Sequence, residues 1–178
     1  MRVVAGRLGG RALVAPRGRG TRPTSDRVRE AVFSILADVD GLRVLDLFAG
    51  SGALAIEALS RGAAGATLVD SSAAAIDAIR RNLAALGLDA EVWAMGVSRF
   101  LERARADARQ YDLVFVDPPY RRASALGREL SIALPDVLAP GARVVTESDR
   151  RAPLDLDLQR SDERRYGDTL IRIHHDPR

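Results

Sequence analysis

The sequence contains no cysteine and no lysine among its 178 residues, and its only histidines are His174 and His175, near the C-terminus. Without cysteine there is no disulfide framework, no thiolate nucleophile and no cysteine-based metal site. Without lysine there is no Schiff-base or pyridoxal-phosphate enzyme and no P-loop of the Gly-Lys-Ser/Thr kind. Two adjacent histidines at a chain end make a poor triad base. We therefore expect chemistry that depends on carboxylates, backbone groups, aromatic rings and arginines, without a metal.

Long apolar runs are also missing. No run approaches the roughly 20 residues that a membrane-spanning helix needs, and residues 1–7 lack the apolar core of a signal peptide. The composition, 47% hydrophobic and 29% charged, is typical of one globular domain of this length and not of a disordered chain. We expect a cytoplasmic, monomeric protein that does not bind a membrane.

The positive charge is unevenly distributed along the chain. Residues 1–25 carry six arginines and no acid, whereas the remaining residues carry 21 arginines against 24 acids. The formal net charge of +3 therefore hides a basic arm ahead of a slightly acidic body. Apolar-rich runs at residues 2–5 and 11–14 predict a small hairpin within this arm. Guanidinium groups bind phosphate oxygens through paired hydrogen bonds, so the arm favours contact with nucleic acid over a merely solvated basic surface.

Short apolar runs and helical patterns alternate along the body, which predicts a mostly parallel sheet with helices on both faces. The expected strands are residues 43–48, 66–69, 90–95, 113–116 and 143–146. The expected helices between them are residues 52–61, 72–86, 97–107 and 124–138. An earlier helix should be N-capped by Thr24 or Ser25 and end near Leu36. Two final strand-like runs, 158–165 and 169–174, predict an antiparallel pair added to the sheet.

The first expected strand of the body leads into a tight glycine turn, in the sequence Asp46-Leu47-Phe48-Ala49-Gly50-Ser51-Gly52. Glycines let the atoms of a cofactor approach the backbone closely. The next strand ends in Asp70, and an acid at that place can accept hydrogen bonds from both hydroxyls of an adenosyl ribose. The spacing Gly50-x-Gly52-x-x-Ala55 also fits a dinucleotide-binding turn. Asp46, four residues before Gly50 and six before Gly52, instead resembles the first motif of S-adenosylmethionine-dependent methyltransferases. This loop alone therefore leaves S-adenosylmethionine and NAD both open.

The fourth expected strand is followed by Asp117, Pro118, Pro119 and Tyr120. Two prolines stiffen the backbone, so that the carboxylate and the Pro118 carbonyl become two fixed acceptors beside a flat ring. Such a site suits a planar substrate with an exocyclic amino group, because the acceptors hold its N–H bonds while the ring stacks on the base. Methyl transfer to that amine requires no cysteine. The plainer alternative is a stiff turn that only ends a strand.

Asp-Pro-Pro-Tyr resembles the [Asp/Asn/Ser]-Pro-Pro-[Tyr/Phe] motif of methyltransferases that act on adenine N6, guanine N2 or glutamine amide nitrogen. Further segments closely resemble the RsmD family of bacterial 16S rRNA guanine-N2 methyltransferases: residues 3–11, 21–30, 45–54 and 57–63. The resemblance covers most of the chain and weakens after about Pro140. It implies a Rossmann-like, seven-stranded α/β methyltransferase domain over residues 24–178, with residues 1–23 as a basic hairpin arm. It also implies S-adenosylmethionine as the cofactor and 16S rRNA, or the assembling small ribosomal subunit, as the partner.

The resemblance also implies roles for single residues. The cofactor would be bound by Asp46, Phe48, Ala49, Gly50, Ser51, Gly52, Asp70, Ser71, Gly96 and Val97. Gly96 and Val97 stand where such enzymes often have a polar residue, so we expect backbone and apolar contacts with the adenine there. The guanine would be held by Asp117, Pro118, Pro119 and Tyr120. RNA phosphates would be bound by Arg7, Arg11, Arg22, Thr24, Arg27 and Arg29.

Two other functions remain open from the sequence. The first is an adenine-N6 methyltransferase acting on DNA or RNA, although the chain has no obvious insertion for reading a DNA site. The second is a nucleotide-binding protein that associates with RNA without catalysis.

Overall fold

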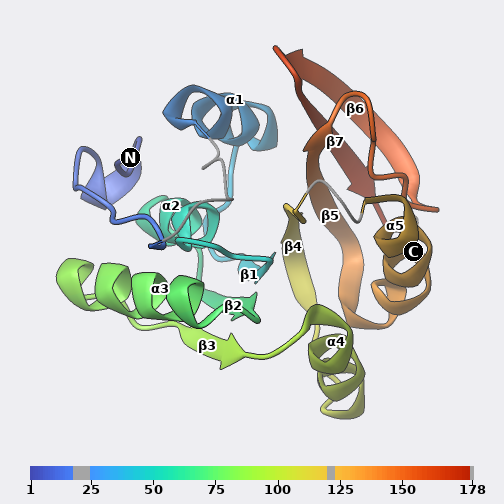
Figure 1. The fold of residues 1–178 in the computed structure, drawn as a ribbon, viewed down its shortest axis with the longest axis horizontal. Helices are drawn as coiled ribbons and strands as arrows, with labels where there is room; N and C mark the ends of the chain where they lie inside the picture. Colours follow the sequence, from blue (N-terminus) through green and yellow to red (C-terminus); the bar gives the residue numbers. More distant parts are fainter. Residues whose placement is uncertain (18–24, 120–122, 177–178) are drawn as a thin grey trace.

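A seven-stranded sheet forms the centre of the molecule in the computed structural model, which describes residues 1–17, 25–119 and 123–176 (Figure 1). The strands are β1 (Arg43–Leu47), β2 (Gly65–Asp70), β3 (Glu91–Ala94), β4 (Tyr111–Val116), β5 (Leu138–Asp149), β6 (Gln159–Tyr166) and β7 (Thr169–His175). They lie in the order β3-β2-β1-β4-β5-β7-β6. The first five run parallel to one another, and β7 runs antiparallel between β5 and β6. The predicted Rossmann-like α/β sheet and its final antiparallel pair are confirmed.

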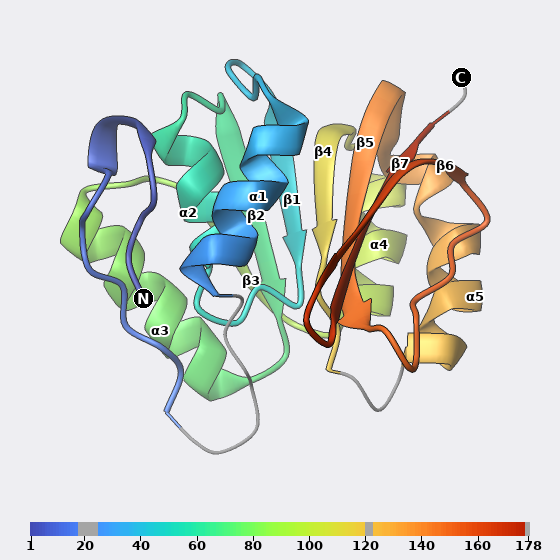
Figure 2. The same ribbon diagram turned by 90° about the horizontal axis from the view of Figure 1, so that it is seen from above.

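Helices cover both faces of this sheet. They are α1 (Asp26–Leu36), α2 (Ala53–Ser60), α3 (Ala73–Leu86), α4 (Val97–Ala106) and α5 (Ala123–Ala133), with 3-10 turns η1 (Gly6–Leu8) and η3 (Pro135–Val137). The helices α1, α2 and α3 lie on one face, and α4 and α5 lie on the other (Figure 2). Ser25 caps α1, since its hydroxyl accepts a hydrogen bond from the Val28 N–H at 3.2 Å. The predicted helix over 124–138 is two elements, because Pro135 has no N–H with which to continue α5.

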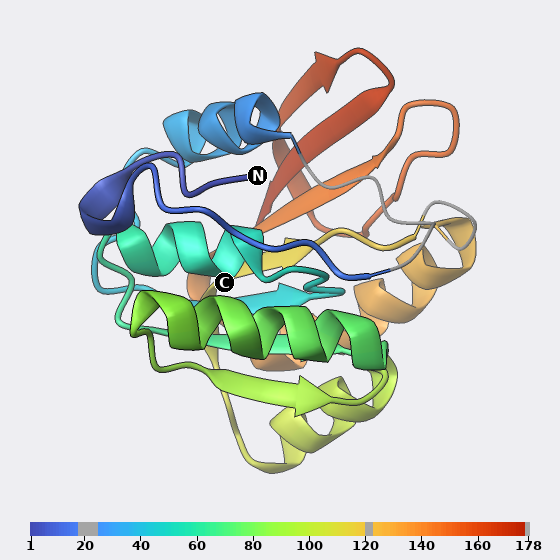
Figure 3. The same ribbon diagram turned by 60° about the vertical axis from the view of Figure 1, so that its left-hand side comes forward.

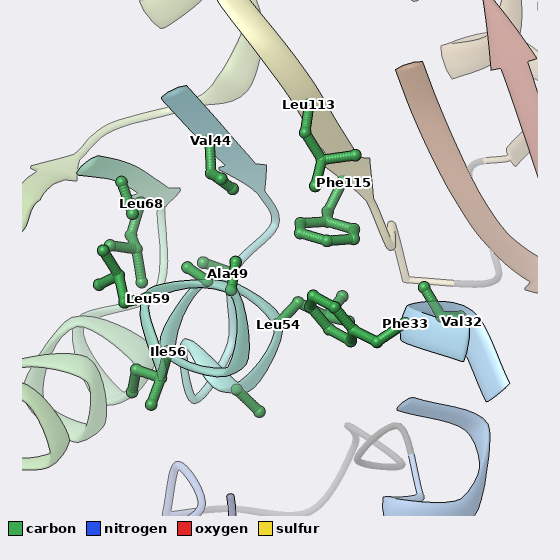
Figure 4. Close-up of a cluster of buried hydrophobic side chains, with 14 of the residues drawn as sticks. Val32, Phe33, Val44, Ala49, Leu54, Ile56, Leu59, Leu68, Leu113 and Phe115 are labelled. Carbon is green, nitrogen blue, oxygen red and sulfur yellow. The ribbon is translucent and has the colours of Figure 1, made fainter. Parts of the chain in front are cut away.

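Alternation along the buried strands sends successive side chains to opposite helical layers. In β4, Leu113 and Phe115 belong to the core under α1, α2 and α3, whereas Val114 and Val116 belong to the core under α4 and α5. Phe33 of α1 contacts Phe115 with ring centroids 5.7 Å apart and ring planes tilted by 52°, and Figure 4 shows the two rings next to each other. This contact fixes α1 over the centre of the sheet.

The N-terminal residues form an irregular hairpin. A single antiparallel bridge joins Arg2 and Ala12, and the Val3 N–H donates to the Arg11 carbonyl at 2.9 Å. Figure 3 shows this segment lying against α2 and α3. Val3 and Leu13 are buried in the main core. The predicted hairpin is therefore present, with its apolar side chains packed into the body.

Candidate functional site

The glycine loop and the Asp-Pro-Pro turn follow two neighbouring strands and so lie at one edge of the sheet. Strand β1 pairs in parallel with β4, with Leu47 opposite Val116. The Asp117 N–H donates to the Leu47 carbonyl at 3.5 Å, which holds the start of the turn beside the end of β1. The chain winds outward from β1 toward β3 and from β4 toward β5. Open α/β sheets bind their ligands at such a switch point.

The glycine loop itself is held in an unusual backbone conformation. Phe48, Gly50 and Gly52 all have positive φ values, of 61°, 57° and 77°. The Gly50 N–H donates to Asp70 Oδ2 at 2.9 Å. Gly52 leaves no room for a side chain, since an added Cβ would lie 2.8 Å from a methyl group of Leu68. A positive φ at a non-glycine residue such as Phe48 is uncommon and is typical of loops with a function.

Asp46 is buried directly before this loop, with 1% of its surface exposed. Its Oδ2 accepts a hydrogen bond from the Ala55 N–H at 3.2 Å, at the start of α2. Burial raises the pKa of Asp46 to about 8; the hydrogen bond from Ala55 works against this rise, and the negative charge of Asp70 adds to it. The Asp46 carboxyl is therefore mostly protonated at pH 7 and would ionise if a cation were placed beside it.

Asp70 closes β2 at the same edge. Its Oδ1 accepts the Ser72 N–H at 2.8 Å, and Ser71 lies exposed next to it. Asp70 pairs in register with Ala94, the last residue of β3, so the start of α4 lies nearby. Gly96 is exposed there, with open space where a Cβ would point. Val97 is only 7% exposed and packs in the core, which favours the backbone contacts among the backbone and apolar contacts that we expected there.

The structure brings the described part of the Asp-Pro-Pro-Tyr motif to this edge. Asp117 is partly exposed, Pro118 is buried and Pro119 is exposed. Tyr120 lies outside the described residues, as do two residues predicted to contact RNA, Arg22 and Thr24.

A buried carboxylate that the sequence analysis left without a role attaches the arm to α2. Glu57 is fully buried. It accepts the Val4 N–H at 2.7 Å and the Ala5 N–H at 2.9 Å, and it pairs with Arg61 at 2.8 Å. A charged residue inside a short, mostly apolar helix is the sequence signal that could have revealed this role, because buried carboxylates need partners.

Ser60, one turn further along α2, completes the attachment. Its hydroxyl donates to the Ala5 carbonyl at 2.6 Å and accepts the Leu8 N–H at 3.0 Å. Gly6 is required beside it, because a Cβ at this positive-φ position would lie 2.1 Å from the Ser60 carbonyl oxygen. Two of the segments that carry the family resemblance, residues 3–11 and 57–63, are thus the two sides of one contact.

The described arginines predicted to contact RNA divide into two groups. Arg7, Arg11 and Arg27 are exposed, and Arg11 donates to the Ala85 carbonyl at the end of α3 at 3.1 Å. The prediction for Arg29 is wrong: this side chain is fully buried, and its guanidinium donates to Asp26 at 2.9 Å. The physical reason is the helical period, which places position 29 on the inner face of α1 together with the apolar residues at positions 28, 32, 33 and 36.

A separate cavity of about 610 Å³ lies at the opposite edge of the sheet, where the strands begin. None of the residues predicted for the site lines it. Its charged groups pair with one another, Arg43 with Asp112 at 2.9 Å and Arg109 with Glu91 at 2.5 Å. Within residues 1–17, 25–119 and 123–176, no group of three His, Asp or Glu side chains could hold a metal ion. No helix in these ranges has the length and apolar character needed to cross a membrane.

Comparisons with known proteins place the chain in a family. The family model described as Conserved hypothetical protein 95 matches residues 1–175. The protein YlbH of Bacillus subtilis is 37% identical over 98% of this chain and 98% of its own length. Ribosomal RNA small subunit methyltransferase D of Escherichia coli is 45% identical over 124 residues, which cover 68% of this chain and 61% of that protein. The solved structure of yhhF from Escherichia coli superposes with a TM-score of 0.84 at 37% identity, covering 98% of this chain and 97% of that one. The chain belongs to the RsmD family of methyltransferases, which the Conserved hypothetical protein 95 model represents.

Proposed function

We propose that this chain transfers a methyl group from S-adenosylmethionine to the exocyclic N2 amine of a guanine in 16S ribosomal RNA. The observation that carries the proposal is the adjacency of the Asp117–Pro118 turn and the glycine loop, after the paired strands β4 and β1. Acceptors for an amine therefore lie beside a loop suited to a cofactor. The similarity to a protein named Ribosomal RNA small subunit methyltransferase D supports ribosomal RNA as the substrate class.

The site residues fit S-adenosylmethionine better than NAD. Asp46, a buried acid that would ionise beside a cation, precedes the loop, and the methionine part of S-adenosylmethionine carries an ammonium group. The pyrophosphate of NAD is anionic and would offer this acid no cation with which to pair. Asp70 presents two carboxylate oxygens for the ribose hydroxyls. Gly50 and Gly96 have room where a Cβ would point, so a ligand could approach their backbone closely.

In this proposal the cofactor supplies an electrophilic methyl group, and the chain positions the nucleophile. The Asp117 carboxylate and the Pro118 carbonyl accept the two N–H bonds of the guanine amine. This draws its lone pair out of conjugation with the ring and toward the methyl group. After transfer the nitrogen bears the methyl group and both of its original protons, so it is positively charged, and Asp117 is placed to accept one of these protons before its release to water. Tyr120 would stack on the base, and Pro119 would keep the turn rigid.

We propose that residues 1–23 form the RNA-contacting arm of a methyltransferase domain that spans residues 24–178. Among the residues that the structure describes, the exposed Arg7, Arg17 and Arg27 form no ion pair with an acid, whereas Arg2 lies 3.8 Å from Asp26. Unpaired guanidinium groups on an exposed surface remain available to phosphate oxygens. A ribosomal RNA substrate implies that the protein acts in the cytoplasm, and we propose that it does so as a monomer.

The test is methylation of small ribosomal subunits that lack this modification, with isotope-labelled S-adenosylmethionine and location of the label by mass spectrometry. We expect label on the N2 atom of one guanine in 16S rRNA. Label on adenine N6 would favour the alternative amino-methyltransferase function, and label only on DNA or protein would contradict the proposal. A thermal-shift assay separates the cofactors, since stabilisation by NAD alone would contradict S-adenosylmethionine.

A further inference from the structure

We infer that Asn82 is a positioning residue that joins the basic arm to the glycine loop, so that cofactor binding and ordering of the arm strengthen each other. The inference rests on the proposed function for the identity of the cofactor. Asn82 is the only asparagine in the chain and is 2% exposed. It lies on the inner face of α3 between the buried Ile79 and Leu83, where an apolar residue would be expected.

The Asn82 amide uses its hydrogen-bonding groups on two separate parts of the chain. Its Oδ1 accepts the Val14 N–H at 2.8 Å, and its Nδ2 donates to the Val14 carbonyl at 3.0 Å. This pairing with both backbone groups of one residue is what a neighbouring β-strand would provide. The Nδ2 also donates to the Ser51 carbonyl, in the glycine loop, at 2.9 Å. Only one orientation of the amide satisfies all three bonds, because an exchange of its oxygen and nitrogen would set like groups against each other.

On the side of the loop, the hydrogen bond from Asn82 Nδ2 to the Ser51 carbonyl fixes the peptide between Ser51 and Gly52. Gly52 has a φ of 77°, and the direction of its N–H depends on the plane of that peptide. Gly50, two residues earlier, is held by Asp70. The loop predicted to bind the cofactor is therefore held on one side by the end of β2 and on the other side by Asn82.

On the side of the arm, the two hydrogen bonds between Asn82 and Val14 hold the end of the hairpin. Val14 comes directly before residues that lead to the exposed Arg17, and Arg11 lies three positions earlier. The start of the arm also reaches the loop, since the Ser51 hydroxyl donates to the Met1 sulfur at 3.7 Å. A phosphate bound by the arm arginines would hold this segment in the position in which Val14 pairs with Asn82.

Linkage makes the effect reciprocal. A ligand that holds the Ser51 peptide also favours the amide orientation that Val14 needs, and an ordered Val14 favours the loop conformation that the ligand needs. Two sites joined in this way change each other's equilibria by the same factor, typically about 5–150-fold. We therefore expect the cofactor to order the arm before any RNA is present.

The test is hydrogen–deuterium exchange of the full chain, followed in peptides from residues 2–14, with and without saturating S-adenosylhomocysteine. In the wild type we expect the ligand to slow exchange in these peptides by about 5-fold or more. In Asn82→Ala the ligand should still bind, but the slowing of exchange should fall below about 2-fold. Asn82→Asp, which keeps the size and the acceptor for the Val14 N–H but lacks the donor to the Ser51 and Val14 carbonyls, replaces this variant if it does not fold.

Ser60→Ala is the matched control. It also removes two hydrogen bonds that hold the arm, but at α2 and away from the glycine loop. It should retain the slowing of arm exchange by the ligand. The inference would be overturned by no slowing in a wild type that binds the ligand, by full slowing in the Asn82 variant, or by equal loss in the Ser60 control. Failure of the wild type to bind S-adenosylhomocysteine in a thermal-shift assay would instead contradict the proposed function.

Discussion

Gly50 and Asp70 are joined by a hydrogen bond of 2.9 Å between the backbone N–H of the glycine and a carboxylate oxygen of the aspartate. The bond links the loop after β1 to the end of β2, and the other carboxylate oxygen accepts the Ser72 N–H. Asp70 therefore stabilises the conformation of the glycine loop even when no cofactor is bound. The same two oxygens are the predicted acceptors for the ribose hydroxyls, so one side chain serves both the loop and the cofactor.

Replacement of Asp70 by Ala should weaken binding of S-adenosylhomocysteine by roughly 10–100-fold, because each hydrogen bond to a charged group contributes about 1.5–3 kcal/mol. Isothermal titration calorimetry measures the change. Asp77→Ala is a suitable control, since Asp77 is an exposed acid on α3 that pairs only with Arg81 among the described residues. Equal affinities of the Asp70 variant and the wild type would contradict the assigned role.

The pKa of Asp46, raised by burial to about 8, predicts a proton effect on cofactor binding. At pH 7 the carboxyl of the free protein is mostly protonated, and a cofactor ammonium would lower its pKa. Binding should therefore release close to one proton, and affinity should rise by up to about tenfold per pH unit below pH 8. Calorimetry in buffers of different ionisation enthalpy counts the protons released. Asp46→Asn should bind without proton release, and a wild type that also releases none would contradict this prediction.

The same pKa makes a prediction about stability in the absence of ligand. The pKa of Asp46 is raised from the ordinary value of 3.8, so its contribution to folding is complete below that pH and is lost as the pH rises through about 8. Urea unfolding of the wild type should therefore show a decline in stability over this range that is absent in Asp46→Asn. Parallel pH profiles of the two proteins would show that Asp46 does not titrate in this way.

Replacement of Asp117 by Ala should lower methyl transfer by about 100-fold or more, since a positioned acceptor at a reacting group contributes on that order. Binding of S-adenosylhomocysteine should be nearly unchanged, because Asp117 holds the substrate amine and not the cofactor. Asp112→Ala tests the same strand at its other end, where Asp112 pairs with Arg43. Transfer should survive in that control, and survival of transfer in the Asp117 variant would contradict the mechanism.

The order of the elements could be predicted from the sequence because each carries a local signal. The alternation of apolar runs and helical stripes gave the strands near Val44 and Leu113, and Ser25 gave the start of α1. The edge that carries the site follows from the parallel topology, since the glycine loop and Asp117 both come directly after strands. These predictions depend only on residues that are close together along the chain.

Contacts between distant segments could not be predicted in the same way. The charge of Arg29 favoured an RNA contact, but the inner face of α1 buries it against Asp26. Glu57 lies within a segment that resembles the family, but its partners are backbone N–H groups of the hairpin, more than 50 positions earlier. Asn82 likewise gave a signal, as a polar residue within an apolar stripe, but its partners are 31 and 68 positions away. A sequence shows that such groups need partners without showing which ones they have.

Glu57→Ala should destabilise the protein by about 3 kcal/mol or more, because two buried N–H groups of the arm lose their acceptor and Arg61 loses its ion-pair partner. Urea unfolding measures the loss. Glu57→Gln, which keeps one acceptor oxygen, should be less destabilising. Glu102→Ala, at an exposed position of α4, should change stability by less than about 0.5 kcal/mol. A stable Glu57→Ala variant would show that the arm does not depend on this carboxylate.

Arg27 and Arg29 stand two positions apart on α1 and should give opposite results when each is replaced by Ala. Arg27 is exposed, so its loss should change the free energy of unfolding by less than about 0.5 kcal/mol. It should also remove about one phosphate contact with RNA, which lowers the slope of log K against log salt concentration by about 0.7–0.9. Arg29 is fully buried, so its loss should cost about 3 kcal/mol of stability, because a cavity remains and its hydrogen bonds to Asp26 and to the Arg2 carbonyl are lost. The salt slope should be unchanged in the fraction that folds. Urea unfolding and filter binding of small ribosomal subunits across a potassium chloride series measure both quantities. A stable Arg29→Ala variant with a reduced slope would restore the RNA contact that the burial of this side chain contradicts.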